Sequence, residues 1–169
     1  MIAAHKCTRA KAKIFIVDDH STLRHGLTQL IDQEDDMISV GEACNATEAI
    51  AGIKKEKPDL VTMDISLAGL NGIKLTEIIL DKQPKMLVLM VSMHDEAIYV
   101  ERILQIGARG YLQKRDLADH IIIAIRSILG GEIYVSNKWE DKPIYKTACL
   151  NTKNKKTRKS PRPKPCPPL

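Results

Sequence analysis

The 169-residue sequence lacks any apolar run long enough to cross a membrane. A transmembrane helix needs about 18 consecutive apolar residues, and no stretch of this chain approaches that length. The N-terminal segment MIAAHKCTRAKAK contains basic side chains but no apolar core of about 7–15 residues, so it does not form a secretory signal. These absences predict a cytoplasmic protein with no membrane partner.

Cysteine is scarce, and its spacing favours neither a metal site nor a disulfide framework. The four cysteines, at positions 7, 44, 149 and 166, include no C-x-x-C pair. Zinc ribbons and disulfide scaffolds need such spacings, so we expect reduced thiols in a cytosol. The first apolar run is also not followed by G-x-G-x-x-G, which argues against a dinucleotide-binding enzyme.

The net charge of +5 is unevenly distributed along the chain. Residues 138–169 contain ten Lys and Arg against two acids, whereas residues 1–137 contain sixteen against nineteen. The basic pI therefore belongs to the C-terminal segment and says little about what the rest of the chain binds. The hydrophobic content of 44% and charged content of 28% are those of an ordinary globular chain.

Residues 13–130 alternate between two hydrophobic patterns that predict an α/β fold. Five short apolar runs, typical of strands buried on both faces, lie at 14–17, 37–43, 59–63, 86–91 and 110–113. After each run, apolar residues recur at helical spacing, and the last such stripe ends at Gly130-Gly131. This alternation predicts a doubly wound, five-stranded parallel sheet of the (βα)5 type, with ligands at the carboxyl ends of its strands.

The patterns divide the chain into a lead at 1–12, one domain at 13–131 and a tail at 132–169. Six of the eight prolines lie in 143–169, and the sequence from 151 onward is basic and then proline-rich. Such a segment cannot bury a core, so we predict a disordered tail. We expect no specific DNA site there, only weak and salt-dependent binding of nucleic acid.

Chemically reactive side chains follow four of the five predicted strands. Asp18 and Asp19 come after the first, Asp64 after the third, Ser92 after the fourth and Lys114 after the fifth. A single aspartate in such a position is usually a helix cap or a turn residue. Because the carboxyl ends of parallel strands meet at one edge of the sheet, the five residues together predict a single site.

The three carboxylates indicate a cation site. Two carboxylates about 4 Å apart repel each other by about 4 kcal/mol at an effective dielectric constant near 20, and a hard cation bound to oxygen ligands, Mg²⁺ before Ca²⁺, relieves that repulsion. With Lys114, such a site suits a dianionic phosphoryl group. One aspartate then serves as the nucleophile and forms an acyl phosphate.

Four stretches carry this pattern: IFIVDDHSTLRHGL, DLVTMDISLAGLNGIKL, LVLMVSMHDE and GARGYLQK. In these motifs and their spacing, residues 13–130 resemble the receiver domain of two-component response regulators, a CheY-like family with a flavodoxin-like fold. The segments VGEACNATEAI and AIRSILGGEIYVS resemble its NarL/FixJ, or LuxR-type, subgroup. Members of that subgroup continue into a helix-turn-helix domain, and the segment 132–169 shows no pattern of that kind.

The resemblance implies a role for each site residue. Asp64 is the expected phosphoacceptor, a sensor histidine kinase is the expected donor, and Mg²⁺ is the expected cofactor. The expected Mg²⁺ ligands are Asp18, Asp19, Asp64 and the backbone carbonyl of Ser66. Ser92 and Lys114 are expected to contact the phosphoryl group, and the rotamer of Tyr111 to follow Ser92 inward.

Two positions depart from the family pattern. Ala68 stands where proline is usual, which predicts a looser loop after the phosphoacceptor. Met93 is bulkier than the small residue often found after the hydroxyl position, and we expect it to crowd Tyr111 or to narrow access to the site. Three histidines near the motifs are interpreted as polar loop or surface residues: His20, His25 and His94.

The resemblance predicts a signalling module whose only chemistry is its own phosphorylation and dephosphorylation. Phosphorylation is expected to change the face formed by the helix at 95–106, the strand at 110–113 and the following helix, for partner binding or homodimer formation. A haloacid dehalogenase-type hydrolase also uses a strand-end aspartate, but it needs a second acid where this chain has Ser66. The alternative prediction is a NarL/FixJ-type DNA-binding transcriptional regulator that has lost or lacks its output domain.

Overall fold

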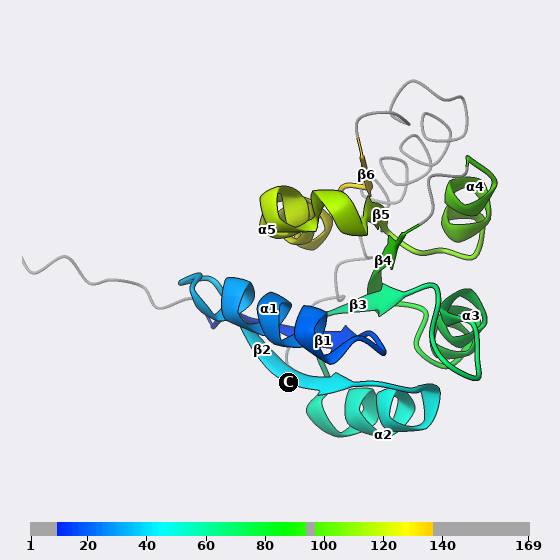
Figure 1. The fold of residues 1–169 in the computed structure, drawn as a ribbon, viewed down its shortest axis with the longest axis horizontal. Helices are drawn as coiled ribbons and strands as arrows, with labels where there is room; N and C mark the ends of the chain where they lie inside the picture. Colours follow the sequence, from blue (N-terminus) through cyan, green and yellow to red (C-terminus); the bar gives the residue numbers. More distant parts are fainter. Residues whose placement is uncertain (1–9, 94–96, 137–169) are drawn as a thin grey trace, which may run out of the picture.

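Strands and helices alternate through residues 10–93 and 97–136, the part of the chain that the computed structural model describes (Figure 1). The strands are β1 (Ala12–Val17), β2 (Met37–Ala43), β3 (Leu60–Asp64), β4 (Leu87–Ser92), β5 (Gly110–Gln113) and β6 (Tyr134–Val135). The helices are α1 (Ser21–Asp32), α2 (Ala46–Glu56), α3 (Gly72–Lys82), α4 (Ala97–Gln105) and α5 (Leu117–Leu129). A 3-10 turn, η1 (Lys114–Asp116), connects β5 to α5.

The strands form one parallel sheet in the order β2-β1-β3-β4-β5-β6. Helices α1 and α5 cover one face, while α2, α3 and α4 cover the other (Figure 1). The chain leaves β1 toward β2 on one side and continues from β3 on the other side, so the order reverses between β1 and β3. The predicted doubly wound sheet is confirmed, and the reversal is where such sheets bind ligands.

Strand β1 shows why the strand sequences are apolar throughout. Ile14 and Ile16 pack into the cluster beneath α1 and α5, whereas Phe15 and Val17 pack into the cluster on the opposite face. Successive side chains of a strand point to opposite faces, and both faces here are covered by helices. A continuous apolar run is therefore the pattern that this position in the sheet requires.

The sheet has six strands, and the prediction of five is corrected in this respect. The sixth, Tyr134–Val135, pairs with β5 beyond the predicted domain boundary at 131. Ile133 and Val135 are 7% and 1% exposed, so their burial stabilises this edge. A strand of two residues is too short to produce a recognisable alternation, and the glycine pair before it is typical of a helix end.

Several predictions fall outside the described residues, namely most of the lead, His94 and the tail from 137 onward. Within the described ranges, no helix is long and apolar enough to cross a membrane. The predicted helix at 95–106 corresponds to α4, whose described bounds are Ala97 and Gln105.

Candidate functional site

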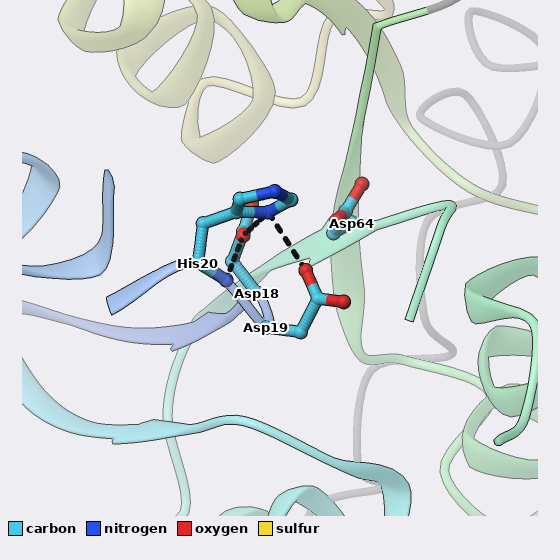
Figure 2. Close-up of side chains that lie close together, drawn as sticks. All are labelled: Asp18, Asp19, His20 and Asp64. Carbon is cyan, nitrogen blue, oxygen red and sulfur yellow. Dashed lines mark hydrogen bonds and ion pairs between the residues drawn. The ribbon is translucent and has the colours of Figure 1, made fainter. Parts of the chain in front are cut away.

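The three predicted aspartates lie together at the carboxyl edge of the sheet. Asp18 follows β1 and Asp64 ends β3, the two strands between which the order reverses. Both are almost completely buried, at 2% and 1% exposed, whereas the side chain of Asp19 is 29% exposed. One potential ligand atom from each of Asp18, Asp19, Asp64 and the neighbouring His20 lies within 4.8 Å of the others (Figure 2).

Lys114 joins this cluster from the end of β5. Its Nζ atom lies 2.7 Å from Asp18 Oδ2 and 2.8 Å from Asp64 Oδ2, and its side chain is only 6% exposed. Burial lowers the pKa of this ammonium, but the hydrogen bonds to Asp18 and Asp64 outweigh burial and raise the pKa above its ordinary value. Lys114 therefore stays charged and fixes the position of two carboxylates at once.

The charges of the cluster do not balance. Asp18, Asp19 and Asp64 contribute three negative charges, and Lys114 contributes one positive charge. A divalent cation supplies the two charges that are missing, and the donor set of carboxylate oxygens is the one that Mg²⁺ prefers. The residues present thus fit the predicted Mg²⁺ site.

The loop after β3 is fixed where the backbone at Gly72 packs closely against the backbone at Asp64. The Ser66 amide donates a hydrogen bond of 3.1 Å to Asp64 Oδ1, and the Gly72 amide donates one of 2.9 Å to the Ile65 carbonyl. A Cβ atom on Gly72 would lie 1.8 Å from the Asp64 carbonyl oxygen, so only glycine fits there. The role predicted for the Ser66 carbonyl as a Mg²⁺ ligand stays a prediction.

Ser92 and Tyr111 lie on the strands beside the cluster. Ser92 ends β4 one residue after Val91, which pairs with Asp64, and its side chain is fully buried. Tyr111 lies within β5 and is also fully buried, whereas Met93 is 72% exposed. The expectation that Met93 crowds Tyr111 or narrows access to the site stays a prediction, and Met93 lines the groove beside Lys114.

Comparison with known proteins agrees with this geometry. Residues 14–126 match the response regulator receiver domain family. This chain belongs to that family. It is 33% identical over 128 residues to the transcriptional regulatory protein DegU of Brevibacillus brevis, covering 76% of this chain and 54% of the relative. Over 127 residues it is 35% identical to the oxygen regulatory protein NreC of Staphylococcus aureus, covering 75% of this chain and 58% of the relative.

The similar solved structures include a member of the LuxR-type subgroup. A crystal structure of a LuxR-family two-component response regulator from Aurantimonas sp. SI85-9A1 superposes with a TM-score of 0.71 at 30% identity, covering 86% of this chain and 99% of that one. The predicted NarL/FixJ, LuxR-type, resemblance is confirmed. The receiver spans just over half the length of the curated relatives that it matches.

Two residues that the sequence interpretation missed also touch the receiver's site. His20, interpreted from the sequence as a polar loop residue, places its Nδ1 atom 2.7 Å from Asp19 Oδ1 and 3.2 Å from Asp18 Oδ1 (Figure 2). Arg24 donates from Nη1 to the Asp18 carbonyl oxygen at 2.7 Å and from Nε to Glu42 at 3.3 Å. The available signal was position, since His20 directly follows the aspartate pair and Arg24 lies one helical turn later.

Proposed function

We propose that this receiver accepts a phosphoryl group on Asp64 from a sensor histidine kinase in a phosphorelay. The contact between Lys114 Nζ and Asp64 Oδ2 at 2.8 Å carries the proposal, because it places a buried, permanently charged ammonium beside the nucleophile. Asp64 is also the deepest of the three carboxylates, with a side chain that is 0% exposed. Burial therefore shields the Asp64 carboxylate from bulk solvent in the unphosphorylated state.

The transfer needs no general base. A carboxylate oxygen of Asp64 forms a bond to phosphorus, the bond from phosphorus to the donor nitrogen breaks, and the electron pair of that bond leaves with the donor. Lys114 neutralises charge on the transferred group, and the Ser66 amide donates to the other oxygen of Asp64. Mg²⁺ held by Asp18, Asp19 and Asp64 supplies further charge neutralisation when it is bound.

A groove lies beside the cluster, and we propose that a partner reaches the site through it. It has a volume of about 670 Å³ and is lined by residues of α1 together with Met93, Lys114 and the start of α5. Its lining includes the apolar side chains Leu23, Leu27 and Leu30. In this proposal the histidine kinase contacts the partly buried Leu23 and Leu30 of α1 while its phosphohistidine reaches Asp64.

The phosphorylated state is proposed to be read at the face formed by α4, β5 and α5. In this proposal Ser92 and Tyr111 connect the cluster to that face. Burial of both side chains and the contacts of α4 and α5 with β5 support the proposal. A hydrogen bond from Ser92 to the phosphoryl group would draw this hydroxyl toward Asp64 and bias the face toward a partner or a second copy of the receiver.

A second candidate is control of transcription, which the similarity to a transcriptional regulator favours. DegU is called a transcriptional regulatory protein, and the receiver matches just over half of its length. A gel shift with the full chain tests this candidate. Sequence preference that survives about 200 mM salt would support it, because non-specific binding by basic residues fades at that salt concentration.

The phosphoacceptor assignment is tested with acetyl phosphate as a small donor. In the presence of Mg²⁺, the intact protein should gain the mass of one phosphoryl group, and chelation of Mg²⁺ should prevent the gain. Asp64→Asn should abolish labelling, whereas Asp81→Asn, at an exposed position on α3, should label like the wild type. Labelling that persists in Asp64→Asn would refute the assignment.

A further inference from the structure

We propose that Arg24 is a positioning residue for the cation site: its guanidinium holds the Asp18 carbonyl and thereby fixes the turn that places Asp18 and Asp19. The inference rests on the proposed function, because phosphorylation of Asp64 in that function uses Mg²⁺ at this site. It adds a residue outside the acidic cluster that determines how tightly Mg²⁺ binds.

Arg24 reaches this turn from the start of α1. Its Nη1 atom donates to the Asp18 carbonyl oxygen at 2.7 Å, and its side chain is only 14% exposed. A hydrogen bond with a charged donor is shorter and about twice as strong as a neutral one. The Asp18 carbonyl belongs to the planar peptide group that joins Asp18 to Asp19, so this bond sets the orientation of that peptide.

The bond from Arg24 completes the fixation of Asp18. The Asp18 amide donates to the Ala43 carbonyl at 3.1 Å, and Asp18 Oδ1 accepts from the His20 amide at 2.8 Å. Asp18 Oδ2 lies 2.7 Å from Lys114 Nζ. The carbonyl oxygen is the remaining polar group of Asp18, and Arg24 binds it. Loss of Arg24 would therefore release the peptide that leads from Asp18 to Asp19.

Asp19 depends on this peptide more than Asp18 does. Its carboxylate contacts His20 Nδ1 at 2.7 Å, and the side chain of that histidine is 67% exposed (Figure 2). Because an exposed partner holds a side chain weakly, the preceding backbone largely determines where the Asp19 carboxylate lies. Rotation of the peptide between Asp18 and Asp19 would turn Asp19 away from Asp64, with which it shares the cation site.

Glu42 aims the guanidinium at the carbonyl. Glu42 lies in β2 directly before Ala43, and its Oε2 atom accepts from Arg24 Nε at 3.3 Å. The donors of a guanidinium form a rigid planar fork, so a bond at Nε also constrains the direction of Nη1. The end of β2 therefore holds both backbone groups of Asp18: Ala43 accepts from its amide, and Glu42 orients the residue that donates to its carbonyl.

Charge and geometry make opposite predictions for Arg24→Met, which keeps a long side chain but removes the donor and the charge. Removal of a positive charge beside a cation site would by itself strengthen Mg²⁺ binding. Loss of the positioning bond weakens Mg²⁺ binding, because the Asp19 ligand is no longer held in place. The direction of the change therefore distinguishes the two effects.

The affinity of the full chain for Mg²⁺ is measured by isothermal titration calorimetry in the wild type, Arg24→Met and Arg102→Met. Arg102 is the matched control, because it pairs with Glu77 at 3.5 Å on helices that cover the opposite face of the sheet from α1. We expect Arg24→Met to weaken Mg²⁺ binding about tenfold and Arg102→Met to change it by less than about twofold. The Mg²⁺ concentration that gives half-maximal labelling by acetyl phosphate should rise by the same factor in Arg24→Met.

Urea unfolding without Mg²⁺ separates positioning from stability, since a merely structural role lowers the free energy of unfolding and leaves the Mg²⁺ affinity of the folded chain unchanged. If Arg24→Met does not fold, Arg24→Lys replaces it. Lysine keeps the charge, but one ammonium cannot serve Asp18 and Glu42 as the fork does, so Mg²⁺ binding should again weaken. Unchanged or tighter Mg²⁺ binding in the variant that folds, or equal losses in it and in Arg102→Met, would overturn the inference.

The same measurements separate this inference from the function on which it rests. If the wild type binds Mg²⁺ and is labelled by acetyl phosphate while Arg24→Met binds Mg²⁺ normally, only the role of Arg24 is refuted. A wild-type chain that neither binds Mg²⁺ nor is labelled would refute the phosphoacceptor function itself, and the inference with it.

Discussion

Two clusters in this receiver place one cation between carboxylates, and they differ mainly in burial. At the carboxyl edge, Lys114 bridges Asp18 and Asp64 with a side chain that is 6% exposed. Away from that edge, Arg126 of α5 bridges Glu34 and Asp36 in the connection between α1 and β2, and its side chain is 47% exposed. The first cluster also contains Asp19, so it carries an excess of negative charge.

This difference in burial indicates that the Lys114 cluster is a binding site and that the Arg126 cluster is a structural ion pair. Water screens the Arg126 cluster, and exposed ion pairs contribute about 0–1 kcal/mol, so this cluster joins α5 to a neighbouring loop at little cost. Buried charges lose hydration that their attraction does not fully restore. The Lys114 cluster is therefore an expensive arrangement for stability alone, and its excess negative charge makes sense as a binding site.

Gly72→Ala should have the largest effect on stability, because the added methyl group clashes with the backbone that positions Asp64. The added Cβ would lie 1.8 Å from the Asp64 carbonyl oxygen, so we expect the free energy of unfolding to fall by about 3 kcal/mol or more and labelling to fall with it. Gly26→Ala on α1, with nothing within 4 Å of its added Cβ, should instead gain about 0.5–1 kcal/mol. Urea unfolding compares the two variants, and equal stabilities would contradict the packing argument.

Lys114→Met tests the buried cluster directly. It leaves Asp18 and Asp64 without their shared ammonium, and breaking a buried pair costs about 3 kcal/mol. Arg126→Met is the matched change in the exposed cluster. Denaturant unfolding should show a loss for Lys114→Met at least twice that for Arg126→Met, and equal losses would show that burial does not distinguish the clusters.

Added Mg²⁺ should stabilise one cluster and leave the other unaffected. At ten times its dissociation constant, a cation that binds only the folded receiver adds about 1.4 kcal/mol to the free energy of unfolding. Asp19→Asn should reduce this gain, because it removes one carboxylate ligand, whereas Arg126→Met should keep it. Thermal unfolding with and without Mg²⁺ makes the comparison, and a gain that Asp19→Asn leaves intact would place the cation elsewhere.

The smallest effect concerns pH at the Arg126 cluster. The hydrogen bond from Arg126 lowers the pKa of Asp36, so this pair stabilises the fold above the ordinary aspartate pKa of about 3.9 and is lost as pH falls through the lowered value. Because both side chains are about half exposed, the stability difference between wild type and Arg126→Met should stay below about 1 kcal/mol near neutral pH. Unfolding curves from neutral to acid pH should show that difference vanish, and a difference that persists in acid would contradict the assignment.

The sequence was informative where a feature repeats or is concentrated. Apolar runs in strands such as β1 predicted the sheet, and the strand ends located Asp18, Asp64 and Lys114. The sixth strand was not predicted, because a strand of two residues is too short to show a hydrophobic periodicity. The position of His20 directly after the aspartate pair was a signal, but the contact of its ring with Asp18 and Asp19 depends on side-chain conformation, which residue spacing does not fix.

The Arg126 cluster was also not predicted from the sequence, for a related reason. It joins residues 90 and 92 positions apart in the chain, and each of them is an ordinary exposed charge when it is read alone. Lys114 makes contacts of similar type, but its position directly after a predicted strand, where catalytic groups gather in such sheets, marked it out.

The most direct test of the account is to locate the phosphoryl group after labelling with acetyl phosphate and Mg²⁺. Borohydride reduces an aspartyl phosphate to homoserine and leaves free aspartate unchanged, and peptide mass spectrometry then identifies the modified position. The account predicts homoserine at position 64, with Asp18 and Asp19 intact. Homoserine at 18 or 19, or none at any position of a labelled protein, would contradict it.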